Sequence, residues 1–170
     1  GDCEVRFEPL GVVVVVCPYT QPTLLMHLDA VSAMLAGCTV VCKPSERTPA
    51  AGQLYAEIVH EADLPRGVFN LVLGDAATGQ ALVTDPGVDG VLFTGSAAVA
   101  AQIRASLADR EDLMVRASTS DHATAIVLDD AQLEDTAHQI VIGQCTSAGQ
   151  RCTSTRRVLA TRRAAAPLVE

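Results

Sequence analysis

Residues 11–43, GVVVVVCPYTQPTLLMHLDAVSAMLAGCTVVCK, decide the fold of this chain. Residues 11–18 are a continuous run of mainly β-branched side chains, which is typical of a strand covered on both faces in a parallel sheet. Residues 23–36 place apolar side chains at helical spacing and end at Gly37, a favourable residue after a helix. Residues 38–43 are a second apolar run. The stretch therefore predicts one strand–helix–strand unit.

The same alternation continues beyond this unit. Thr48 and Pro49 predict the start of a helix, with Thr48 as its cap and the proline in its first turn. Further strands are predicted at residues 69–73, 90–94 and 113–117, and further helices at residues 77–84 and 96–107. This alternation predicts a Rossmann-like α/β fold, an open and mostly parallel sheet with helices on both faces. In such sheets, ligands bind beyond the carboxyl ends of the strands.

Several residues at the predicted strand ends have the chemistry to hold a cofactor. Gly95 and Ser96 lie between a strand and a helix, where free backbone N–H groups suit a pyrophosphate; a capped helix without a ligand is the alternative. Lys43, the only lysine, and Glu46 follow another strand and can hydrogen-bond a ribose diol; a surface ion pair is the alternative. The cofactor-binding candidates at this edge are Pro18, Tyr19, Lys43, Ser45, Glu46, Gly74, Gly95 and Ser96.

Composition narrows the function further. The 170 residues carry 12 basic and 20 acidic side chains, a net charge of −8, so nucleic acid is not an expected partner. The longest apolar run, residues 10–17, is far shorter than the roughly 20 residues that span a bilayer. We therefore expect a cytoplasmic chain, away from membranes, with its six cysteines reduced. Cys38 and Cys42 have the spacing of metal ligands, but no second Cys or His pair accompanies them, so no metal site is predicted.

The pattern changes after residue 118. We predict a strand at residues 123–128, a helix at 133–142, a turn at 147–152 and a strand at 156–161. The expected domains are residues 1–120, a dinucleotide-binding fold, and residues 121–170, the start of a second, catalytic lobe. Cys152 follows a glycine turn, with Arg156 and Arg157 nearby, and is a candidate nucleophile with an exposed sulfur and a lowered thiol pKa. An ordinary buried cysteine is the alternative.

Taken in order, these segments resemble the aldehyde dehydrogenase superfamily. The resemblance covers nearly the whole chain and is carried by EPLGV at residues 8–12, CPY at 17–19, AGCTVVCKPSE at 36–46, LPRGVFN at 64–70, FTGS at 93–96 and GQRC at 149–152. Within the superfamily, residues 147–157 look most like the succinylglutamate-semialdehyde dehydrogenase branch.

The resemblance implies a role for each matching residue. Cys152 would attack the aldehyde carbon as a thiolate to form a thiohemiacetal, which gives a hydride to the nicotinamide and becomes a thioester. Lys43 and Glu46 would contact the adenine ribose, and Gly95 and Ser96 the pyrophosphate. The implied cofactor is NAD, with NADP as the alternative, because a carboxylate such as Glu46 favours NAD.

Two catalytic positions depart from the family pattern. Thr20 stands where the family has an Asn that stabilises the oxyanion, and such a donor is worth about 10²–10³ in rate in other oxyanion holes. Ser118 stands where the family has a Glu that activates water for deacylation, and a positioned base supplies about 10²–10⁴ in rate. Asp121 and His122 are close by in sequence but lie in the wrong register to replace it. We therefore expect a loss of turnover.

Two hypotheses follow. In the first, the chain is the cofactor-binding and nucleophile-bearing part of a NAD(P)-dependent aldehyde dehydrogenase, impaired or inactive in isolation. In the second, it is a degenerate aldehyde-dehydrogenase-like structural or interaction module without turnover. Because family members are far longer, the second lobe would expose apolar surface, which predicts a homo-oligomer or a larger parent chain. An aldehyde is the expected substrate if the chain is active.

Overall fold

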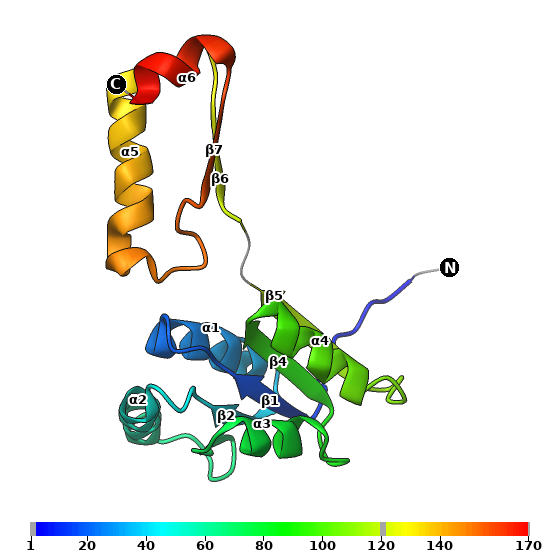
Figure 1. Cartoon of the computed structure of the whole chain (residues 1–170). Coiled ribbons are helices and arrows are strands. Elements are labelled where there is room, and N and C mark those ends of the chain that lie inside the picture. The colour runs from blue at the N-terminus through cyan, green and yellow to red at the C-terminus, as the bar shows by residue number, and fades with distance from the viewer. Residues whose placement is uncertain (1–2, 120–121, 170) are drawn as a thin grey trace. The chain divides into compact units, whose positions relative to one another are not determined.

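The chain divides into two compact units, Gly1–Thr119 and Ser120–Glu170, called unit 1 and unit 2 below (Figure 1). The computed structural model describes residues 3–119 and 122–169. Each unit is built around its own sheet.

Unit 1 contains a five-stranded sheet in the order β3-β2-β1-β4-β5. Its strands are β1 (Val12–Val16), β2 (Thr39–Lys43), β3 (Phe69–Leu71), β4 (Gly90–Gly95) and β5 (Met114–Thr119). All four neighbouring pairs are parallel; Val16 lies beside Lys43 on one side and Phe93 on the other. The predicted Rossmann-like fold is confirmed, because this order matches the first five strands of a dinucleotide-binding sheet.

Helices cover both faces of this sheet (Figure 1). Val13 and Val15 of β1 pack with Met26 and Ala30 of α1 (Pro22–Leu35), on the face that α2 (Pro49–Glu61) also covers. Val14 points the other way and packs with Ile103 of α4 (Ala97–Ser106), on the face that α3 (Ala76–Val83) covers. Successive strand residues point to opposite faces, which explains why a continuous valine run is needed here.

The helix ends follow local chemistry, with one exception. Gly37, with φ of +86°, follows α1, and the Asp75 carboxylate caps α3 by accepting from the backbone N–H groups of Ala77 and Thr78. The prediction that Thr48 caps α2 is wrong in its chemistry. Thr48 precedes the helix, but its side chain makes no capping hydrogen bond, and its Oγ1 is buried without a partner among the described residues. Pro49, which needs no partner for its nitrogen, starts this helix instead.

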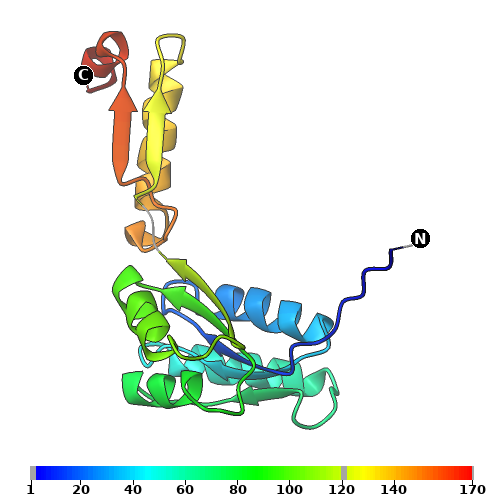
Figure 2. The same ribbon diagram turned by 90° about the vertical axis from the view of Figure 1, so that its right-hand side faces the viewer.

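Unit 2 is a two-stranded parallel sheet with helices. β6 (Thr124–Val127) and β7 (Arg157–Ala160) lie side by side, as Figure 2 shows, and α5 (Leu133–Cys145) connects them through a short 3₁₀ turn at Thr146–Gly149. A final helix, α6 (Arg162–Val169), was not expected. Within residues 3–119 and 122–169, every helix is too short or too polar to cross a bilayer.

Candidate functional site

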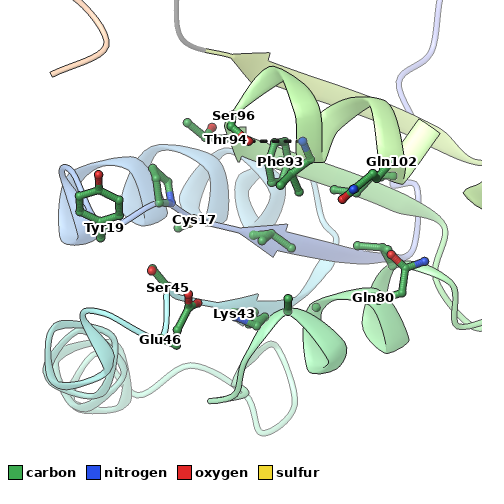
Figure 3. A pocket seen from close by; sticks show the side chains of 18 of the residues that line it. Cys17, Tyr19, Lys43, Ser45, Glu46, Gln80, Phe93, Thr94, Ser96 and Gln102 are labelled. Carbon is green, nitrogen blue, oxygen red and sulfur yellow. Dashed lines mark hydrogen bonds between the residues drawn. The ribbon is translucent and has the colours of Figure 1, made fainter. Parts of the chain in front are cut away.

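A cavity of about 690 Å³ opens at the carboxyl ends of β1, β2 and β4 in unit 1 (Figure 3). The chain leaves β1 toward the face covered by α1 and leaves β4 toward the face covered by α4. Neighbouring strands whose helices cover opposite faces leave a crevice between them, and the volume is typical of small-ligand sites. The predicted residues that line the cavity are Pro18, Tyr19, Lys43, Ser45, Glu46, Gly95 and Ser96.

Gly74 is the predicted cofactor residue that does not line this cavity. It follows β3, the edge strand, which β2 separates from β1. The loop after β3 is therefore not at the point where the helices change faces. Gly74 has a local role instead, because a Cβ at this position would collide with the side chain of Thr78 in α3.

Lys43 ends β2 and is buried, with 3% of its surface exposed. Its Nζ donates to the carbonyl oxygen of Pro44 at 3.1 Å, and a Cβ on Gly79 of α3 would lie 3.4 Å from its Cδ. An ammonium has three donors, and Lys43 makes no other side-chain hydrogen bond within the described part of the chain. Because burying an ammonium is costly without partners, the remaining donors suit an oxygen-rich ligand in the cavity.

The turn after Lys43 forms one rim of the cavity. Glu46 is exposed there, and Ser45 Oγ accepts from the backbone N–H of Arg47 at 3.3 Å. The Arg47 guanidinium lies 4.8 Å from the centroid of the Tyr19 ring, so a cation–π contact joins this turn to the loop after β1. The rim thus offers an exposed carboxylate, that of Glu46, and an aromatic ring that Arg47 contacts.

Gly95 and Ser96 form the turn that leads from β4 into α4. A Cβ on Gly95 would collide with the tip of the buried Phe93 ring, so a larger residue here would have to displace this ring. Ser96 Oγ accepts from the N–H of Val99 at 3.3 Å, which caps the helix. The first N–H groups of α4 point out of the helix start, and the helix dipole makes this end positive. Ser96 lines the cavity, so the turn can receive an anionic group there.

Burial raises the pKa of two acidic groups near the cavity, Cys17 and Asp29. Cys17 lines the cavity, but burial and, to a smaller extent, the charge of Asp29 raise its pKa to about 12. Burial also raises the pKa of Asp29, against the opposing effects of Arg116 and of the Thr94 hydroxyl, which donates to Asp29 Oδ2 at 3.5 Å. Cys17 is therefore an unreactive thiol near neutral pH.

The two positions that depart from the family pattern lie in unit 1. Thr20 is half-buried in the loop between β1 and α1 and does not line the cavity. Ser118 is exposed on β5, directly beside Thr94 of β4. His122 belongs to unit 2, and Asp121 lies outside the described residues.

Cys152, the candidate nucleophile, is exposed in unit 2. The turn before it has three consecutive residues with positive φ, Ser147, Ala148 and Gly149, of which only the glycine adopts this region without strain. Arg156 holds the turn by donating to the carbonyl oxygen of Gly149 at 2.9 Å. The alternative of an ordinary buried cysteine therefore does not apply to Cys152; it describes Cys38 and Cys42, which are buried in the core.

Among the cavity residues that were not predicted from the sequence, three carry long polar side chains. Arg47 lines the rim, and Gln80 of α3 and Gln102 of α4 line the part of the cavity between these helices. The position of Gln102, six residues after Ser96 and next to the core residue Ile103, is the signal that could have placed it near the site. Within the described residues, no group of three His, Cys, Asp or Glu side chains could hold a metal ion.

Sheet order, helices on both faces and a cavity beyond the strand ends define a Rossmann-type α/β protein. Comparison with known proteins makes this class more specific. The chain belongs to the aldehyde dehydrogenase family, whose profile matches residues 2–170.

Named relatives agree with this assignment. The chain is 42% identical over 159 residues to N-succinylglutamate 5-semialdehyde dehydrogenase of Novosphingobium aromaticivorans, covering 94% of this chain and 34% of the relative. The structure of an NAD-dependent aldehyde dehydrogenase from Sinorhizobium meliloti is 37% identical with a TM-score of 0.90, over 95% of this chain and 32% of that one. An E. coli NADP-dependent enzyme is 31% identical with a TM-score of 0.90, over 95% of this chain and 34% of that one. The chain thus spans about a third of the length of these proteins.

Proposed function

We propose that unit 1 binds a nicotinamide dinucleotide in the cavity at the ends of β1, β2 and β4. The main support is that buried Lys43 and the Gly95–Ser96 turn, from strands on either side of β1, line one cavity. Lys43 has donors for ribose hydroxyls, Glu46 can accept from them, and the start of α4 suits the pyrophosphate. Relatives of both NAD- and NADP-dependent type share this fold.

Glu46 favours NAD over NADP. Its carboxylate is exposed at the rim beside Lys43, where it can accept from a ribose diol. A 2′-phosphate at that place would bring two negative charges together. NAD⁺ should therefore bind more tightly than NADP⁺. Glu46→Gln removes the negative charge and should reduce the difference in affinity between the two dinucleotides.

A thermal unfolding experiment tests cofactor binding. NAD⁺ at 100 times its Kd stabilises a folded protein that binds it by about 2.7 kcal/mol, so the Tm of the chain should rise. Lys43→Met keeps most of the aliphatic stem but removes the ammonium and should reduce the rise. A Tm that neither dinucleotide changes would contradict the proposal.

The proposed reaction is oxidation of an aldehyde to a carboxylate with Cys152 as the nucleophile. The thiolate adds to the aldehyde carbon, the resulting thiohemiacetal loses a hydride to become a thioester, and water releases the acid. The dinucleotide, when bound, accepts the hydride. Exposure of Cys152 and its fixed turn support this role, and a semialdehyde such as that named for the relative is the first substrate to try. The free cysteines suit a reducing, cytoplasmic environment.

Thr20 and Ser118 argue for weak turnover. A Thr side chain lacks the amide donor, and a serine cannot take a proton from water near neutral pH. These two residues favour the second candidate, a member of the family that keeps the fold and cofactor binding without turnover. If the chain with Cys152 intact forms no carboxylic acid from the aldehydes tested, that result would support this second function.

An aldehyde oxidation assay separates the two candidates. Reduction of NAD⁺ is followed by absorbance with a panel of aldehydes, and Cys152→Ala should abolish it. Cys145→Ala is the matched control, because Cys145 is another exposed cysteine of unit 2. Activity that survives Cys152→Ala would remove this residue as the nucleophile.

The apolar surface of unit 2 suggests that another polypeptide segment covers it. A cavity of about 560 Å³ lies among residues of α5, β7 and α6, including Ile140, Val141 and Leu159. We propose that a second copy or a larger parent chain contacts this surface. Light scattering coupled to size-exclusion chromatography would show a mass above 17.7 kDa if copies of the chain associate through it.

A further inference from the structure

The part of the cavity between α3 and α4 is an apolar slot with two amide groups. Val83 of α3 and Val99 and Ile103 of α4 supply aliphatic surface, and Phe93 of β4 lies between the helices and the sheet. Of the described lining residues that α3 and α4 contribute, only Gln80 and Gln102 have side chains with hydrogen-bonding groups.

Gln80 and Gln102 lie at the same end of the cavity (Figure 3). They come from different helices, and both side chains are exposed, so their carboxamides are free to turn toward a ligand. Tyr19 and Ser45 lie at the opposite end in the same view. The polar side chains of the slot, Gln80 and Gln102, therefore lie at one end of the cavity.

The base of the dinucleotide is the group that this slot fits, an inference that rests on the proposed function. With the pyrophosphate at Ser96 and the adenosine ribose at Lys43 and Glu46, the space left for the base is the one between α3 and α4. Its aliphatic walls suit the flat faces of a purine. The edge of the purine then meets the carboxamides.

We propose that Gln80 and Gln102 make this site selective for adenine by reading the edge formed by N6 and N7. A glutamine carboxamide accepts one hydrogen bond and donates another, and it pairs with adenine by accepting from the N6 amino group and donating to N7. Hypoxanthine has an oxygen in place of the amino group, so its O6 and N7 are both acceptors. A carboxamide that faces this edge keeps only one of its two hydrogen bonds.

The test compares NAD⁺ with nicotinamide hypoxanthine dinucleotide by isothermal titration calorimetry of the 170-residue chain. Loss of one hydrogen bond predicts that NAD⁺ binds about three- to tenfold more tightly. Gln80→Met and Gln102→Met replace the amides with apolar chains of similar length, and the double variant should bind both dinucleotides equally. Gln53→Met is the matched control, since Gln53 is exposed on α2 and pairs with Glu57 outside the cavity.

Each outcome decides the matter. If the unsubstituted chain binds NAD⁺ and nicotinamide hypoxanthine dinucleotide with equal affinity, the proposed selectivity for adenine is overturned. Dinucleotide binding itself would still stand. If the glutamines only pack against the base, the double variant loses affinity for both ligands and keeps their ratio, which also overturns the proposal. Binding of neither dinucleotide overturns the proposed function together with this inference.

Discussion

At the scale of single residues, Asp29 is a carboxyl group in unit 1 whose charged form is disfavoured by burial. Its carboxylate is half-buried between α1 and the sheet, and burial raises its pKa more than Arg116 and Thr94 lower it. An unfolded Asp has a pKa of about 3.9. Between that pH and the raised folded pKa, the folded chain holds a proton that the unfolded chain has released. The stability from this proton is complete below the unfolded pKa and is lost as the pH rises through the folded pKa.

Asp29→Asn should therefore raise the Tm at pH 7. An asparagine cannot ionise, and its Oδ1 can still accept from Thr94, so the cost of a half-buried charge disappears. The gain should shrink as the pH falls through the raised pKa of the natural carboxyl, because the carboxyl then takes up its proton. Thermal unfolding followed by circular dichroism from pH 4 to 8 measures the difference in Tm between the variant and the natural chain. Asp109→Asn, at an exposed position, is the control. A variant that is less stable than the natural chain at pH 7 would show that the pairing with Arg116 outweighs burial.

At the scale of elements, α2 fixes the turn that carries Lys43 and Glu46. Gly52 of α2 is buried, and a Cβ there would lie 2.5 Å from Cγ of Pro44, which is itself buried. Gly52→Ala gains about 1 kcal/mol of helix propensity, but overpacking of this kind costs about 1–3 kcal/mol. Because the proline ring cannot rotate away, we expect a lower Tm and weaker NAD⁺ binding.

Urea unfolding and calorimetry of Gly52→Ala would check both effects. Gln53→Ala on the same helix is the control, since it gains propensity at an exposed position without meeting Pro44. If Gly52→Ala stabilised the chain, α2 would have to be able to move away from the turn, and its role in fixing that turn would be wrong.

The elements of unit 1 were predictable because their chemistry is local. Short β-branched valine runs favour strands buried on both faces, and Ser96 and Gly37 mark helix ends by their own conformations. α6 was missed because residues 162–169, RRAAAPLV, combine helix-forming alanines with a proline inside the helix. Thr48 was misjudged because its hydroxyl is buried, which sequence spacing does not reveal.

The site was predictable only in part for a related reason. Lys43, Glu46 and Ser96 follow strands directly, so parallel topology alone places them at one edge. Gly74 also follows a strand, but its distance from β1 depends on strand order, which local pattern does not give. Gln80 and Gln102 line the cavity only because α3 and α4 pack on the same face of the sheet.

At the scale of the whole molecule, the two units differ in how much apolar surface they bury. Unit 1 has two core clusters, one on each face of its sheet. Among the described residues of unit 2, only Val127, Ser154 and Ala164 are buried, and no residue of α5 is. Few buried contacts mean a low local free energy of opening.

Hydrogen exchange followed by mass spectrometry should therefore separate the units in the isolated chain. Peptides from β1 and β4 should stay protected long after peptides from α5 have exchanged. A partner that covers unit 2 would slow exchange in α5 and leave β1 unchanged. Equal protection of α5 and β1 in the monomeric chain would contradict the expectation that unit 1 is stable and that unit 2, with few buried residues, opens easily.

Dinucleotide binding at the ends of β1, β2 and β4 is the claim on which the other proposals depend. An NMR titration of the ¹⁵N-labelled chain with NAD⁺ tests it most directly, because each backbone amide reports its own surroundings. We predict that the amide signals of Ser96, Ala97, Lys43 and Gly79 shift and saturate together. Shifts confined to unit 2, or no shift in unit 1 at millimolar NAD⁺, would contradict it.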